Sequence, residues 1–216
     1  MLDLLIPTIA QGLLWSLLAL GVYITFRVLD IADLSVEGTF PLGAAVAATC
    51  ITSGHSLVTA FVLAVLAGCV AGAVTGLLTT KLKIPALLSG ILTMIGLYSI
   101  NLRVMGRANL SLLGQTTIYS WGASAGLTEA QTTLAVGLIA ALLVVAVVYW
   151  FFGTELGCSL RATGCNPSMS RAQGINTDRN KVLGLMLSNG LVALSGALLT
   201  QYQGFADINM GRGSIV

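Results

Sequence analysis

The chain has 216 residues, of which 56% are hydrophobic and only 8% are charged, and its formal net charge at pH 7 is +2. Soluble domains carry roughly a quarter of charged residues, so this composition excludes a soluble protein and indicates an all-α integral membrane protein. The small net charge gives no reason to expect a nucleic-acid partner.

The chain shows no motif for metal binding or for catalysis. Cys50 and Cys69 lie in apolar runs, Cys158 and Cys165 stand without other metal ligands nearby, and the single histidine, His55, is isolated. No GxxxxGK[ST] loop or HExxH motif occurs. We therefore expect no metal, no cofactor and no enzymatic activity in this chain.

Six apolar segments approach the roughly 20 residues that a transmembrane helix needs. They cover residues 4–26, 31–53, 57–80, 84–102, 132–152 and 182–202. We expect a bundle of about six transmembrane helices that forms a single domain over residues 1–216.

The second segment combines acidic residues with residues that disfavour helix. Asp30, Asp33 and Glu37 lie at its start, and Gly38 and Pro41 follow them. We expect a broken or late-starting helix. Acidic residues beside irregular backbone at membrane depth are candidates for a transport path. The alternative is that Asp30 and Asp33 lie in an aqueous loop and only cap the next helix.

The third segment carries a small residue at every fourth position, which places these residues on one helix face. Such stripes allow helix backbones to approach closely, so we expect a packing seam. Its members are Ala60, Ala64, Gly68, Gly72, Gly76 and Thr80.

Other polar residues within the apolar segments are candidates for lining a solute path or for hydrogen bonds between helices. With the acidic region, the candidates for the path are Asp33, Ser35, Glu37, Asn101, Ser188, Asn189 and Gln201. They form no motif that specifies a substrate. The polar stretch 106–130 holds Tyr119 and Trp121, aromatic residues that favour the membrane boundary, and could form a short interfacial helix or part of a docking surface.

The longest basic interruption of the apolar pattern is the stretch 157–181. Asn166 can cap a helix, Pro167 suits the first helical position, and Gly174 can end the helix after about two turns. We interpret residues 166–173 as a short helix that a soluble partner grips. An ordinary polar loop is the alternative.

The positions of lysine and arginine predict the orientation. If the N-terminus lies outside, the inner loops hold seven basic residues and the outer segments hold three, so residues 157–181 are expected in the cytosol. The inner residues are Arg27, Lys81, Lys83, Arg161, Arg171, Arg179 and Lys181, and the outer ones are Arg103, Arg107 and Arg212.

Two motifs resemble those of one permease family. Asp33-Leu34-Ser35-Val36-x-Gly38 is similar to the signature after the first core span of bacterial ABC importer permeases of the branched-chain amino acid and ribose type. Leu160-Arg161-Ala162-x-Gly164-x-Asn166-Pro167 with Gly174-Ile175-Asn176 is similar to the cytoplasmic coupling segment of that family. The resemblance covers about residues 10–213, and the string that starts at Ala32 is similar to a subgroup of tryptophan-like amino-acid importer permeases.

The resemblance implies a permease in the bacterial inner membrane that forms the path for a small solute such as an amino acid. It implies a second permease copy, two cytosolic ATPases that hold ATP and magnesium, and an extracytoplasmic binding protein that delivers the solute. The ATPase contact would comprise Arg161, Asn166, Pro167, Ser168, Met169, Ser170, Arg171 and Gly174. Family members continue with further spans, so we expect a chain that is truncated at its C-terminus relative to them.

Two other functions compete with the ABC importer. An ion-coupled secondary transporter would use Asp33 or Glu37 to bind a proton or sodium ion, but no inverted repeat is visible. A non-transporting scaffold would use the capped cytosolic helix only for docking.

Overall fold

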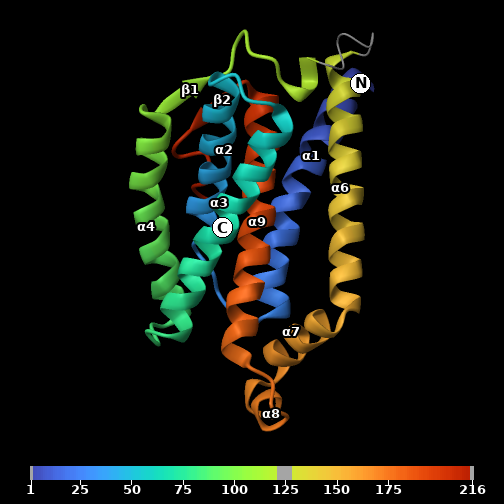
Figure 1. Ribbon diagram of the computed structural model, residues 1–216. Helices are drawn as coiled ribbons and strands as arrows, with labels where there is room; N and C mark the ends of the chain where they lie inside the picture. Colours follow the sequence, from blue (N-terminus) through green and yellow to red (C-terminus); the bar gives the residue numbers. More distant parts are fainter. Residues whose placement is uncertain (1, 121–127, 215–216) are drawn as a thin grey trace.

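The computed structural model describes residues 2–120 and 128–214, and it shows a bundle of long helices (Figure 1). At one edge α1 (Leu2–Tyr23) packs against α6 (Glu129–Gly153), and α4 (Ala86–Met105) lies at the opposite edge. Between these edges lie the three helices that pack most closely on one another, α2 (Val36–Thr52), α3 (Leu57–Thr80) and α9 (Thr177–Gln203).

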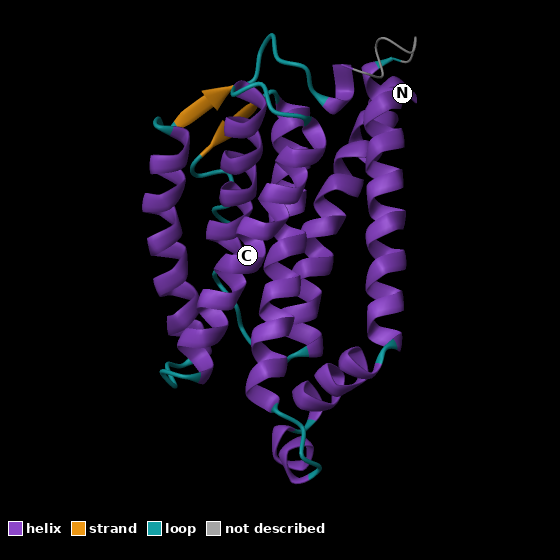
Figure 2. Ribbon diagram, in the orientation of Figure 1, coloured by secondary structure: helices purple, strands orange, loops and turns teal. Residues whose placement is uncertain are grey.

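Shorter elements lie at the two ends of the bundle. A π-helical turn, η1 (Ile24–Val28), extends α1, and α7 (Glu155–Cys165) and α8 (Pro167–Ala172) lie at the same end (Figure 1). At the other end β1 (Asn109–Ser111) pairs antiparallel with β2 (Phe205–Asp207), as Figure 2 shows. Neither α7 nor the strand pair was expected from the sequence.

Within the described residues, five helices are long and apolar enough to cross a membrane. They cover Ile6–Val28, Leu57–Thr80, Ala86–Met105, Ala130–Gly153 and Thr177–Gln203. Together with α2, a shorter apolar helix of 17 residues, these helices confirm the expected bundle of about six apolar helices.

The second span starts late, as expected, but the expected break is wrong. Helix α2 begins at Val36 and continues through Pro41 to Thr52 without interruption. Pro41 lies in the second turn, where its missing N–H removes only the bond to the carbonyl of Glu37. A Cβ atom at Gly211 would collide with this carbonyl oxygen, so the segment after β2 covers the weakened turn.

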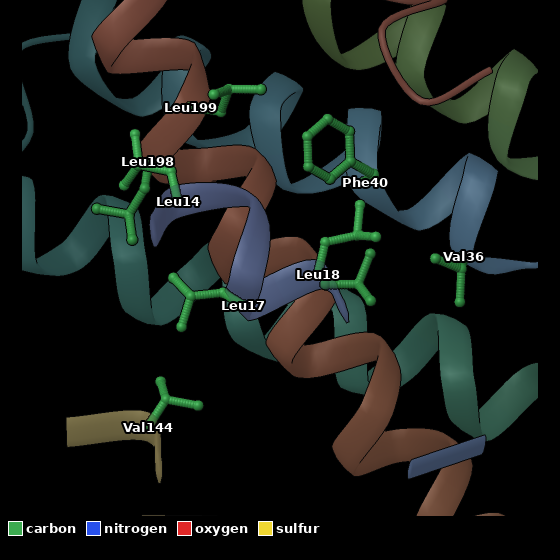
Figure 3. Packing of buried hydrophobic residues seen from close by; sticks show 9 residues of the cluster. Leu14, Leu17, Leu18, Val36, Phe40, Val144, Leu198 and Leu199 are labelled. Atoms are coloured by element: carbon green, nitrogen blue, oxygen red, sulfur yellow. The ribbon is translucent and has the colours of Figure 1, made fainter. Parts of the chain in front are cut away.

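The largest apolar cluster joins α1, α2 and α9, with one residue from α6. Figure 3 shows its members Leu14, Leu17, Leu18, Val36, Phe40, Val144, Leu198 and Leu199. Trp15 stacks on Phe40 with ring centroids 5.5 Å apart. This cluster holds α1 to the central helices, while most of α6 remains exposed and apolar, as a lipid-facing helix would be.

The stripe of small residues on α3 forms its contact with α9. Ala60 and Ala64 are fully buried, and a Cβ atom at Gly68 would lie 2.5 Å from the backbone oxygen of Asn189. One turn later, a Cβ at Gly72 would collide with the backbone of Leu185. The two backbones therefore touch along the stripe, which is the close approach that such residues allow.

Candidate functional site

Helix α8 is a separate, capped turn that protrudes at one end of the bundle (Figure 1). The side chain of Asn166 accepts hydrogen bonds from the backbone N–H of Met169 (3.0 Å) and from the hydroxyl of Ser168 (2.7 Å). Pro167 occupies the first helical position, and Gly174, with φ of +82°, follows the helix end. The structure therefore places the helix and its signals where the sequence indicates them.

The protruding helix is tied to the start of α9. Arg171 donates from Nε to the hydroxyl of Thr177 (2.7 Å), and its guanidinium pairs with Asp178 at 3.2 Å. Ser170 is buried beneath the turn, whereas the side chain of Met169 is 58% exposed. The surface that α8 offers is thus an apolar tip on a fixed turn, and Arg171 already has partners within its own chain.

Helix α7 connects the lipid-facing α6 to α8 and packs on η1. Thr154 caps it by accepting from the N–H of Gly157 (3.3 Å), and Arg161 donates back to the carbonyl of Phe152 (3.0 Å). A Cβ atom at Gly164 would collide with the carbonyl oxygen of Val28 in η1. The sequence signal for this helix was the Thr154 cap followed by an acidic residue, a typical helix start.

A second set of contacts joins α7 to α9. The Nδ2 of Asn180 donates to the hydroxyls of Ser159 (2.5 Å) and Thr163 (2.9 Å). Because Asn180 and Thr163 are buried, these bonds are shielded from water. Helices α7, α8, the first turn of α9 and η1 therefore form one connected unit.

The polar residues of the second span meet Asn189 halfway along α9. Asp33 is fully buried, and its carboxyl oxygens accept from the N–H of Ser35 (2.8 Å) and from the Nδ2 of Asn189 (2.9 Å). The Oδ1 of Asn189 accepts in turn from the hydroxyls of Thr39 (2.6 Å) and Ser35 (3.2 Å). Thr39 was not among the candidates, because a threonine within an apolar run gives no distinct signal.

In the conformation described, this network holds the start of α2 and the segment before it against the middle of α9. Each polar atom of the Asp33 and Asn189 side chains has a partner, and both residues have no exposed surface. The alternative that Asp33 lies in an aqueous loop is therefore wrong, whereas Asp30 is exposed in the loop after η1. Asp33, Ser35 and Asn189 are brought together, but no cavity adjoins them among the described pockets.

Two further candidates, Glu37 and Asn101, line a cavity of about 220 Å³ between α2, α4 and the segment after β2. Asn101 is fully buried, and its Nδ2 donates to the carbonyl of Gly38 (3.2 Å). Its Oδ1 is the buried side-chain atom without a partner in the described part of the chain. Arg212 lies at the same cavity, with its guanidinium 5.8 Å from the ring centre of Tyr98.

The other polar candidates serve local contacts. Ser188 donates to the carbonyl of Gly21 (2.6 Å), and Gln201 accepts from the N–H of Ile118 (3.1 Å). Tyr119 packs edge-on against Tyr202, and burial, followed by the neighbouring Tyr202, raises the pKa of its phenol. Trp121 lies outside the described residues.

A family model described as "Branched-chain amino acid transport system / permease component" matches residues 4–216. The chain belongs to this family. The match includes both the capped α8 and the Asp33 region, so the family resemblance expected from the two sequence motifs is confirmed.

Several curated relatives support membership of this permease family. The chain is 43% identical to a tyrosine transport system permease protein of Clostridioides difficile over 98% of its own length and 69% of that protein. It is 38% identical to an uncharacterised protein of Rickettsia prowazekii over 98% of its length and 73% of the relative. The autoinducer 2 import system permease protein LsrC of Salmonella choleraesuis is 29% identical over 91% of the chain and 55% of that protein. No solved structure gives a significant match.

The chain is thus a multi-pass membrane permease of a bacterial ABC importer. Its relatives are permease subunits of transport systems, so the membrane helices and their internal contacts, rather than a reaction centre, are the features that need a functional account.

Proposed function

We propose that this permease carries an amino acid across the bacterial inner membrane and that a cytosolic ATPase drives it through α8. An extracytoplasmic binding protein would deliver the solute at the opposite end of the bundle, and a second copy of the permease would complete the path. ATP and magnesium would bind to the ATPase and not to this chain. The family description and the tyrosine transport relative support the amino acid as the transported solute.

The protruding α8 is the observation that carries the proposal. Its apolar tip at Met169 is exposed, while its base is held by the Asn166 cap and by the Arg171 contacts with Thr177 and Asp178. An exposed apolar side chain on a small rigid turn suits insertion into a groove of a partner, and a rigid turn transmits displacement better than a loop. The proposed contact surface includes Arg161, Asn166, Pro167, Ser168, Met169, Arg171 and Gly174, and Ser170, buried beneath the turn, would support it from below.

Force applied at α8 has a defined route into the bundle. The bonds from Asn180 couple α7 to α9, and the backbone contact of Gly164 with Val28 couples α7 to η1. The loop after η1 leads to Asp33, which is bonded to Asn189 in the middle of α9. A push on α8 would therefore shift α1, α2 and α9 together, the helices that share the main apolar cluster.

The proposal is tested by separating ATP hydrolysis from uptake in the assembled transporter. Gly174→Val forces a β-branched residue into a left-handed conformation, which costs roughly 1–2 kcal/mol, and Asn166→Ala removes the cap of α8, which costs about 1 kcal/mol. Amino-acid uptake into proteoliposomes should fall several-fold in these variants, while the basal ATPase activity persists.

A matched control distinguishes loss of coupling from general strain. Gly54 has φ of +78° and no neighbouring atom within 4 Å, but it lies in the loop between α2 and α3 at the other end of the bundle. Gly54→Val should leave the ratio of ATP hydrolysed to solute transported unchanged. Normal coupled uptake in Gly174→Val and Asn166→Ala would contradict the proposed role of α8.

A further inference from the structure

The cavity beside Asn101 lies at the middle depth of the bundle. Two of its lining residues, Met94 and Ile95, are central in the 20-residue α4. Glu37 lies in the first turn of α2, which starts where Asp33 bonds to Asn189, halfway along α9. Polar and ionisable groups at such a depth are costly and usually functional.

The Oδ1 of Asn101 lacks a hydrogen-bond donor. The donation from Nδ2 to the carbonyl of Gly38 fixes the orientation of the amide, because a flipped amide would place two acceptors against each other. The fully buried Oδ1 is then an acceptor without a partner, an arrangement that costs about 1–3 kcal/mol. Because Asn101 has no exposed surface in this conformation, a bound molecule with an N–H group would satisfy this atom only after the side chain turns toward the cavity.

Two opposite charges line the same small space. Glu37 is half-buried at the cavity and Arg212 contributes the exposed guanidinium, which lies over the ring of Tyr98. Among the described residues the ion pair formed is that of Arg171 with Asp178, so Glu37 and Arg212 do not neutralise each other by direct contact. The cavity thus offers an acceptor-rich pole and a cationic pole.

We propose that this cavity binds the transported amino acid as a zwitterion. Its ammonium group would donate to the Glu37 carboxylate and, once the Asn101 side chain turns toward the cavity, to the Oδ1 of Asn101. Its carboxylate would accept from Arg212. The side chain would lie along Met94, Ile95 and Tyr98. The volume of about 220 Å³ is below the roughly 300 Å³ of the smallest drug-sized pockets, which suits a solute of amino-acid size.

This inference rests on the proposed function and adds a binding site inside the permease itself. The test uses the full transporter without its binding protein, in detergent, and measures the thermal stabilisation given by three probes. L-Tyrosine carries both charges, tyramine lacks the carboxylate, and 3-(4-hydroxyphenyl)propionate lacks the ammonium group. The variants are Arg212→Gln, Glu37→Gln and Asn101→Leu, with Arg107→Gln, an exposed arginine away from the cavity, as control.

We expect L-tyrosine to stabilise the wild type and Arg107→Gln at the same concentration. Arg212→Gln should weaken the binding of L-tyrosine about tenfold or more and leave the binding of tyramine unchanged, because only the carboxylate loses its partner. Glu37→Gln should weaken the binding of tyramine, which carries the ammonium group. It should leave the binding of 3-(4-hydroxyphenyl)propionate unchanged. Asn101→Leu should resemble Glu37→Gln, and the selective pattern separates loss of a contact from misfolding.

Two outcomes overturn the site. The first is equal stabilisation of the wild type and all variants by L-tyrosine. The second is an equal loss of stabilisation by all three probes in Arg212→Gln and Glu37→Gln. ATP-driven uptake with the binding protein present is measured in parallel. If the wild type takes up no amino acid, the proposed function fails; if it takes up L-tyrosine but the variants show no selective pattern, only the cavity assignment fails.

Discussion

At the scale of single residues, Asn189 is the point where the bundle depends most on polar contacts. Its amide joins Asp33, Ser35 and Thr39 of the second span to the middle of α9, away from water. Replacing it with leucine removes the donor to Asp33 and leaves a buried carboxyl oxygen without a partner. We expect Asn189→Leu to lower the free energy of unfolding by about 1–3 kcal/mol, measured by denaturant titration in detergent.

A double-mutant cycle tests whether the loss comes from the orphaned carboxyl group. Asp33→Leu combined with Asn189→Leu removes both partners, and the double variant should be more stable than the sum of the single effects predicts. Additive effects of the two substitutions would show that the 2.9 Å contact contributes nothing to stability.

Glycines of the α3 stripe should respond to alanine in the opposite way to an exposed glycine. A Cβ at Gly72 would collide with the backbone of Leu185, so Gly72→Ala has to push α3 from α9 and should cost roughly 1–3 kcal/mol. A Cβ at Gly12 in α1 would meet no atom within 4 Å beyond its own helix backbone and chain neighbours, and Gly12→Ala should stabilise the helix by about 0.4–1 kcal/mol. The same denaturant titration measures both, and a common sign for the two changes would contradict the packing role of the stripe.

At the scale of elements, the tie between α7 and α9 is the contact most accessible to a direct test. Asn180→Ala removes two buried hydrogen bonds and should raise local opening of α7. With about 1 kcal/mol per bond, amide hydrogen exchange in α7 should become about thirtyfold faster. Asn209→Ala, an exposed position at the opposite end, should leave this exchange unchanged. Unaltered exchange in Asn180→Ala would mean that α7 is held by the Gly164 contact alone.

The elements also show how far the sequence could lead. The long spans and the capped α8 were predictable because apolar length and the Asn166, Pro167 and Gly174 signals are local. The pairing of β1 with β2 was not predictable, because only three residue pairs form it and the two strands lie about a hundred positions apart in the chain. The unbroken α2 was missed because Pro41 lies early in the helix and Gly211, far along the chain, covers the carbonyl that it leaves free.

The candidate site followed the same rule. Asp33, Ser35 and Asn189 could be selected as unusual polar residues, but their mutual bonding depends on how α2 and α9 dock, which no local pattern specifies. Arg212 was counted only for orientation, since its position at the cavity with Glu37 arises from the return of the segment after β2. Residue type thus identified candidates, and packing determined which of them share a site.

At the scale of the whole molecule, the two ends of the bundle carry different elements. One end holds α7 and α8, and the other holds the strand pair and the loop between α2 and α3 (Figure 1). The distribution of lysine and arginine favours the first end in the cytosol. The orientation with the N-terminus outside stays a prediction, and the cysteines allow a direct measurement of it.

Labelling with a membrane-impermeant maleimide should separate the two ends. Cys158 and Cys165 are exposed on α7, so in a variant with Cys50→Ala and Cys69→Ala they should react in inverted vesicles and not in intact spheroplasts. Ser53→Cys on a background without other cysteines should react in spheroplasts, because the loop after α2 lies at the other end. Adding the partner ATPase to inverted vesicles should slow the reaction of Cys165, which directly precedes the Asn166 cap, several-fold more than that of Cys158. The reverse sidedness would contradict the orientation, and correct sidedness with no protection of Cys165 would place the ATPase contact elsewhere than α8.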